Sequence, residues 1–66
     1  MMFTAITAEL RAAAEAIGDY QRRVGALTAR VGSDHDDLRG AIEEAERSLG
    51  IAERAVRRAI KVAAPR

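Results

Sequence analysis

The sequence predicts an all-α fold: an antiparallel two-helix hairpin that dimerises into a four-helix bundle. Three observations support this prediction. Apolar residues recur every seven positions in both halves of the 66-residue chain, one polar stretch interrupts the repeat, and each half is mainly acidic early and mainly basic late. A heptad pattern sustained over four heptads is typical of helices that pack side by side, and a strand cannot produce it.

The first helix is predicted over about residues 4–31. Its a positions are Phe3, Leu10, Ile17, Val24 and Val31, and its d positions are Ile6, Ala13, Tyr20 and Leu27. Thr4 is an acceptable N-cap, and Gly32 suits the left-handed residue that ends many helices. Because Tyr20 occupies a d position, we expect it in the core with its hydroxyl reaching the edge.

A turn is predicted at about residues 32–35, and the second helix over about residues 34–63. The a positions of this helix are Ile42, Leu49, Val56 and Ala63, and the d positions are Leu38, Ala45, Ala52 and Ala59. Ser33 with Asp36, or Asp34 with Asp37, resembles a capping box. Pro65 would stop the helix, since the residue before a proline disfavours helical geometry. We therefore expect a single hairpin domain over residues 1–66.

The order of charges favours an antiparallel hairpin. Each helix begins acidic and ends basic, which complements its macrodipole and brings opposite signs together when the chain folds back. Between the helices we expect Arg22 and Arg23 beside Glu43, Glu44 and Glu46, and Glu9 beside Arg58. Within the second helix we expect the i,i+4 pairs Glu43–Arg47 and Glu53–Arg57.

One hairpin offers too little apolar burial to be stable alone. Ordering 66 residues costs on the order of 100 kcal/mol of conformational entropy, and much of the 48% hydrophobic content is alanine. The chain has no Cys and one His, which excludes disulfides and a structural zinc site. A homo-oligomer, with a dimer favoured, is therefore expected; a different protein partner and a stable monomer are the alternatives.

The helix-packing interface with this second chain is predicted from small and apolar residues. The apolar stripe of the second helix is wider than one neighbour requires, and glycines seven apart on the first helix indicate close backbone contact. The candidate residues are Gly18, Gly25, Ala41, Ala45, Ser48, Leu49, Ile51, Ala52, Ala55, Val56 and Ala59.

No motif predicts an enzyme, a cofactor or a metal site. The five glycines do not match the spacing of a phosphate-binding loop, and a hairpin offers no deep pocket. The stretch Asp34-His35-Asp36-Asp37 is the one cluster of metal-ligating residue types. We interpret it as a helix start, because acidic residues there complement the macrodipole.

A basic cluster on the second helix is the best candidate for a functional surface. It comprises Arg54, Arg57, Arg58 and Lys61. We interpret it as a solvated face, with binding of nucleic-acid phosphates or of an acidic protein surface as alternatives. The net charge of +1 supplies no overall attraction to nucleic acid.

The alternating small and large layers of the second helix resemble the layout of the Rop family of small RNA-binding hairpin proteins. This resemblance implies a similar dimeric bundle, but no RNA-binding residue of that family can be placed in this sequence.

The function expected from these features is self-association and protein–protein interaction. The chain would act as a small non-enzymatic adaptor, regulator or assembly subunit, and a Rop-like nucleic-acid-binding regulator is the alternative. No apolar run approaches the roughly 20 residues needed to span a membrane, and the first residues do not resemble a signal peptide. We therefore expect a cytoplasmic protein. The chain has ten Arg to one Lys and abundant Ala, and this composition is typical of a high-GC bacterium.

Overall fold

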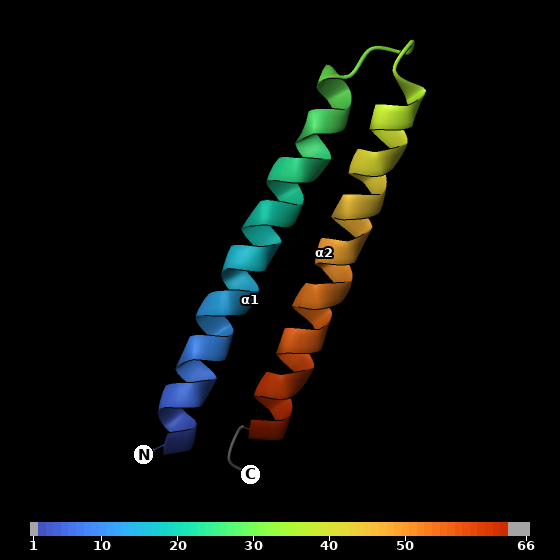
Figure 1. Ribbon diagram of the computed structural model, residues 1–66. Helices are drawn as coiled ribbons and strands as arrows, with labels where there is room; N and C mark the ends of the chain where they lie inside the picture. The colour runs from blue at the N-terminus through green and yellow to red at the C-terminus, as the bar shows by residue number, and fades with distance from the viewer. Residues whose placement is uncertain (1, 64–66) are drawn as a thin grey trace.

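The structure, a computed structural model, describes residues 2–63 of the chain and consists of two long helices. Helix α1 spans Met2–Ala26, a short 3-10 helix η1 spans Leu27–Arg30, and helix α2 spans Asp36–Ala63. The two long helices lie side by side in opposite directions, and both chain ends are at the end away from the turn (Figure 1). The hairpin measures 53 × 14 × 13 Å, and the predicted all-helical hairpin is confirmed for this part of the chain.

The ends of α1 differ from the prediction. The helix begins at Met2, so Thr4 lies within it and is not the N-cap. At the other end the α-helix tightens into η1, and the chain turns extended at Val31, with φ −93° and ψ 127°. No residue of the described part has a positive φ, so the prediction that Gly32 adopts a left-handed conformation is wrong.

Helix α2 begins two residues later than the earliest expected start. The carbonyl of His35 accepts the first helical hydrogen bond, from the backbone N–H of Arg39 at 3.0 Å. Neither Ser33 nor Asp34 makes a side-chain hydrogen bond to the backbone of the described residues, so the predicted capping box is wrong. The helix continues through Ala63, the last residue that the structure describes, so the predicted stop at Pro65 lies outside the described residues.

The seam between the helices uses most of the predicted a positions, although Phe3 is 59% exposed. Of the predicted d positions, Ala52 is half-buried and the others are exposed. The a residues Leu10, Ile17, Val24, Ile42, Leu49 and Val56 are half-buried in the seam. Beside them lie the columns one residue beyond d, which comprise Thr7, Ala14 and Gln21 on α1, Thr28 on η1, and Arg39, Glu46, Glu53 and Ile60 on α2. Tyr20, at a d position, is 53% exposed, so its expected place in the core is wrong.

Small residues explain why the helices close on this flank. Ala14 and Gly18 are buried on α1, and Gly50 is buried on α2. Residues without large side chains let two backbones approach closely, because no Cβ substituent separates them. Besides Ala13, the d positions of α1 and η1 hold the large residues Ile6, Tyr20 and Leu27, which would keep the helices further apart.

Three glycines also set the register of the hairpin. A Cβ placed on Gly25 would lie 2.5 Å from Glu46 Oε2, and one on Gly18 would lie 3.1 Å from Glu53 Oε1. A Cβ on Gly50 would lie 2.7 Å from Gln21 Nε2. At three successive levels, therefore, a glycine of one helix accommodates a long polar side chain of the other, which aligns the two helices along their length.

Arg39 fastens the start of α2 to the end of η1. Its Nη2 donates a hydrogen bond to the Val31 carbonyl oxygen at 2.6 Å. A carbonyl at the end of a helix has no intrahelical partner, so the guanidinium supplies a hydrogen bond that the Val31 carbonyl would otherwise lack.

The threonines of the seam form hydrogen bonds within α1 and its 3-10 extension: Thr7 and Thr28 donate to the carbonyls of Phe3 and Gly25, each at 2.7 Å.

Candidate interaction surfaces

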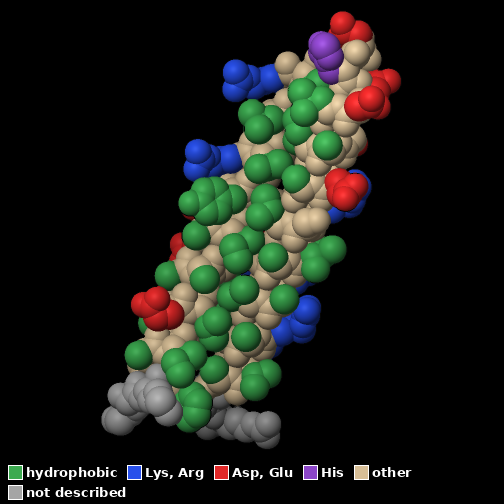
Figure 2. Space-filling model, in the orientation of Figure 1, with side chains coloured by type: hydrophobic (Ala, Val, Ile, Leu, Met, Phe, Trp, Pro, Cys, Tyr) green, Lys and Arg blue, Asp and Glu red, His purple; other side chains and the backbone are tan. Residues whose placement is uncertain are grey.

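One face of the hairpin, called here the apolar face, is covered by uncharged side chains along its whole length. Figure 2 shows this surface continuing across both helices from the turn to the chain ends. It is formed by the exposed d positions together with the neighbouring column of α2, which comprises Ala41, Ser48, Ala55 and Val62. Tyr20 and Leu38 are each 53% exposed on it, and Val62 is 87% exposed.

Two columns of residues border the apolar face. The α1 rim comprises Glu9, Ala16, Arg23 and Arg30, and the α2 rim comprises Asp37, Glu44, Ile51 and Arg58; all eight are exposed. Arg23 places its guanidinium 5.6 Å from the centre of the Tyr20 ring. This distance is within cation–π range, so the contact holds the ring at the rim.

The predicted helix-packing interface is divided between the seam and the apolar face. Gly18 and Gly25 lie in the seam against α2, which accounts for their close backbone contact within the hairpin. Leu49, Ala52 and Val56 are half-buried. The exposed members are Ala41, Ala45, Ser48, Ile51, Ala55 and Ala59.

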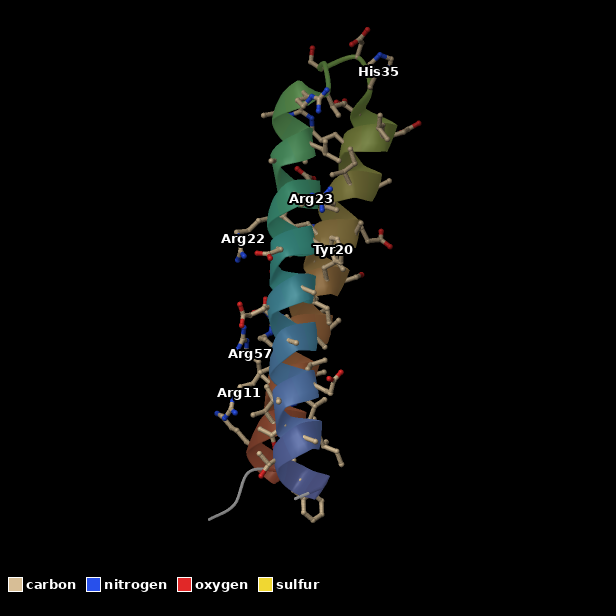
Figure 3. All side chains as sticks on the ribbon, turned by 90° about the vertical axis from the view of Figure 1, so that its left-hand side faces the viewer. Arg11, Tyr20, Arg22, Arg23, His35 and Arg57 are labelled. Carbon is tan, nitrogen blue, oxygen red and sulfur yellow. The ribbon has the colours of Figure 1, made fainter. Side chains whose placement is uncertain are left out.

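The basic cluster gains a fifth residue from the other helix. Arg11 of α1 lines the same shallow depression as Arg57 and Lys61, together with Glu15 and Ile60. Arg54 and Arg58 adjoin this site through a second depression. Arg11, Arg22 and Arg57 project from one side of the hairpin (Figure 3). Arg57 is not a free cation, because its Nη2 lies 2.9 Å from Glu53 Oε2.

The ion pairs expected between the helices are absent from the described residues. The pairs that form involve neighbours within one helix, Arg22 with Asp19 and Arg57 with Glu53, or the turn residues His35 and Asp34. The predicted Glu53–Arg57 pair is therefore confirmed, and Glu43–Arg47 is not formed. Arg23, Glu44, Glu9 and Arg58 lie on the two rims, directed away from the seam, and so do not meet within one chain.

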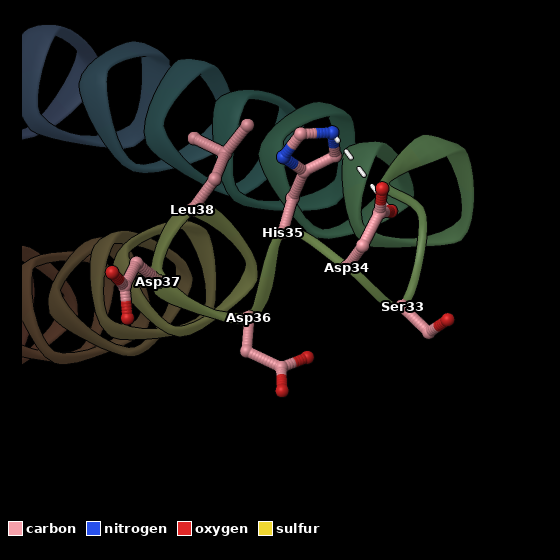
Figure 4. Close-up of a pocket in the computed structure, with 6 residues that line it drawn as sticks. All are labelled: Ser33, Asp34, His35, Asp36, Asp37 and Leu38. Carbon is pink, nitrogen blue, oxygen red and sulfur yellow. Dashed lines mark ion pairs between the residues drawn. The ribbon is translucent and has the colours of Figure 1, made fainter.

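The turn places its polar side chains around an open depression. Ser33, Asp34, His35, Asp36, Asp37 and Leu38 line it, and His35 Nε2 lies 3.9 Å from Asp34 Oδ1. The carboxylates of Asp36 and Asp37 point in different directions, away from His35 (Figure 4). Across the described residues no three His, Cys, Asp or Glu side chains are grouped as metal ligands would be.

Two features of these surfaces differ from the sequence prediction. Arg11 lies outside the predicted basic cluster, although an antiparallel register places the start of α1 beside the end of α2. The exposure of Ile6, Tyr20 and Leu27 was also missed, because the heptad pattern is equally compatible with either flank of the a positions.

Comparison with known proteins provides no relative for this chain. No family model matches it, and neither the curated proteins nor the solved structures contain a significant match. In the part of the chain that the structure describes, neither helix is long and apolar enough to cross a membrane.

Proposed function

We propose that the protein acts by self-association through its apolar face. Two copies bury these faces against each other and form a four-helix bundle, and the dimer serves in the cytoplasm as a non-enzymatic adaptor, regulator or assembly subunit. The observation that carries the proposal is the shortage of core within one chain. Among the described residues the buried hydrophobic side chains are Ala14 and Ile60, and no large side chain is fully buried.

The exposed surface agrees with a missing partner. The chain exposes 5174 Å², whereas a compact monomer of its 7.1 kDa mass is expected to expose about 4,100 Å². The excess is comparable with the roughly 800 Å² that each partner buries in a stable complex. Large continuous exposed apolar patches typically mark protein interaction sites.

Measurement of mass in solution tests the proposal. Sedimentation equilibrium should give twice the chain mass at micromolar to millimolar concentrations. Ala45→Glu, which places a charge on the apolar face, should shift the protein to monomer. Ala8→Glu makes the same change at an exposed position outside that face and should leave the dimer intact. A wild-type monomer at all concentrations, or equal effects of the two variants, would contradict the proposal.

Nucleic-acid binding by the basic cluster is a second candidate. The observation that favours it is the position of Arg11, which extends the cluster across both helices at the end away from the turn. Phosphate contacts made by Arg and Lys weaken steeply with salt. Arg54→Gln with Lys61→Gln should then abolish salt-dependent retention on RNA, whereas Arg22→Gln with Arg47→Gln should retain it. Equal losses would indicate a response to net charge alone.

A further inference from the structure

The rims of the apolar face carry complementary charge patterns. On the α1 rim, acidic Glu9 lies near the chain ends and basic Arg23 and Arg30 lie towards the turn. On the α2 rim the order is reversed, with Asp37 and Glu44 towards the turn and Arg58 near the chain ends. Figure 2 shows these colours along the two edges of the apolar surface. Where both rims are charged, one rim therefore carries the sign opposite to that of the other, while Ala16 and Ile51 leave their middle uncharged.

The exposed side chains also differ in size between the helices. The contribution of α1 to the apolar face consists mainly of large residues, Ile6, Tyr20 and Leu27. The middle of the α2 contribution consists of alanines and Ser48. One helix thus presents protruding side chains and the other a shallow surface that such side chains can fill.

We infer that the partner is a second copy stacked with its turn at the same end, so that α1 of each copy lies on α2 of the other. This inference rests on the proposed self-association and adds the arrangement of the two copies. Two-fold symmetry permits one other face-to-face stacking, with the turns at opposite ends. In that case α1 lies on α1 of the partner and α2 on α2.

The register within the hairpin extends to the partner. A two-fold axis parallel to the helices leaves every residue at its own height, so levels within one chain are also levels between chains. Continuing the alignment of Gly18 with Glu53 and Gly25 with Glu46, Glu9 is level with Val62, one turn from Arg58 of the partner. By the same alignment Arg30 is level with Ala41, between Asp37 and Glu44 of the partner.

Side-chain size favours the same arrangement. With the turns together, the large side chains of α1 face the alanines and Ser48 over the middle of α2, and the larger Leu38 and Val62 lie towards its two ends. With the turns apart, Ile6 of one copy meets Leu27 of the other while alanines of α2 face each other. The separation of packed helices depends on the side chains at the contact, so two rigid hairpins would then need unequal spacings at the two sides.

Repulsion between the two copies of Arg54 and Lys61 at the shared chain ends opposes this arrangement only weakly. Arg54 and Lys61 belong to the column Gly40, Arg47, Arg54 and Lys61, on the far side of each hairpin from the apolar face. In the dimer the thickness of two helix layers, about 20–25 Å, separates the two copies of these residues. That distance exceeds the Debye length of about 8–10 Å at physiological salt, so their repulsion is screened.

A distance between the two turns discriminates the arrangements. The chain contains no Cys, so Ser33→Cys carries a single nitroxide label at an exposed turn position. Pulsed electron–electron double resonance should give a separation between the two labels comparable with the thickness of two helix layers. Turns at opposite ends would separate the labels by most of the 53 Å length of the hairpin, and that result would overturn the inference while leaving the self-association intact.

A label at Glu15→Cys is the matched control. It lies on exposed α1 surface near the middle of the helix. In both arrangements the two labels at this position are therefore much closer together than the length of the hairpin. A short distance for this label with a long one at the turn identifies the opposite stacking. Absence of dipolar coupling at both sites, together with monomer mass, would contradict the proposed self-association itself and the inference with it.

Charge exchange provides a test that needs no label. Glu9→Arg with Arg23→Glu preserves net charge and should weaken the dimer by about tenfold or more, because several exposed pairs change from attraction to repulsion. Glu44→Arg with Arg58→Glu in the same chain should restore the affinity. If α1 instead lay on α1, the two contacting rims would both contain Glu9→Arg and Arg23→Glu. Their charges would then remain complementary. An unchanged dissociation constant would therefore overturn the inference.

Discussion

At the scale of single residues, Arg39 is the side chain that connects the two helices at the turn. Its guanidinium donates to the Val31 carbonyl at 2.6 Å. The other side-chain hydrogen bonds among the described residues all join residues of the same helix or its 3-10 extension. The helix-start chemistry expected of Ser33 and Asp34 is absent. The turn therefore depends on a residue one turn inside α2 instead of on its own side chains.

Replacement of Arg39 tests this dependence. Arg39→Met keeps an apolar stem but removes the donor, and should lower the free energy of unfolding by about 1–2 kcal/mol. Arg47→Met is the control, because Arg47 is exposed, and should change stability by less than about 0.5 kcal/mol. Urea unfolding at a fixed protein concentration measures both. Equal effects would mean that the bond to Val31 contributes nothing.

Gly40 of α2 and Gly25 of α1 differ in what surrounds them. A Cβ on Gly40 would meet nothing within 4 Å, so Gly40→Ala should stabilise the helix by about 0.5–1 kcal/mol. At Gly25 the new methyl must displace the Glu46 carboxylate, so Gly25→Ala should gain less. Thermal unfolding followed by circular dichroism gives both values. Adding Glu46→Ala to Gly25→Ala should recover the difference, and a lack of such coupling would argue against the Gly25–Glu46 contact.

At the scale of helices, α1 and α2 each have two flanks beside their a positions. One flank, with Gly18, Gly25 and Gly50, closes the seam within the chain, and the other remains exposed as the apolar face. Each helix can thus contact two neighbours, which is the requirement for a four-helix bundle. The breadth of the α2 stripe in the sequence is consistent with this division.

Ala52 tests whether a second chain covers α2. It is half-buried at a d position, and in the proposed bundle a neighbouring helix packs against it. Ala52→Leu should then cost about 1–3 kcal/mol by overpacking and lower the dimer fraction. Ala8→Leu, at an exposed position outside the apolar face, should be neutral because Leu is a good helix former. Unchanged mass and stability for Ala52→Leu would rule out the bundle.

At the scale of the whole molecule, stability is expected to depend on association. The elongated hairpin exposes 5174 Å² and encloses almost no core. If folding and dimerisation are coupled, the melting temperature must rise with protein concentration. A hundredfold increase should stabilise the folded dimer by about 2.7 kcal/mol, through mass action.

Circular dichroism over a range of concentrations measures this dependence. The wild-type melting temperature should increase steadily, and Ala45→Glu should unfold at a lower and concentration-independent temperature. A wild-type melting temperature that does not change with concentration would show that the single hairpin is stable by itself. The missing core would then need another explanation.

The sequence by itself determined the two helices, the break between them and the residues of the a positions. These features follow from local causes: the period of the apolar residues, the polar run around Ser33 and the directional preference of charges along a helix. Pairing of Glu53 with Arg57 has the same origin, since both residues belong to one helix face.

Only the tertiary structure decided which flank of each helix closes the seam. Both flanks are free of charge over most of α1, so the heptad pattern does not distinguish them, and the choice depends on how closely two backbones can approach. Glycines opposite Glu46, Gln21 and Glu53 allow the closer approach on one side. That rotation turns Tyr20 and the rim charges away from the seam, because a side chain's direction depends on the orientation of the whole helix.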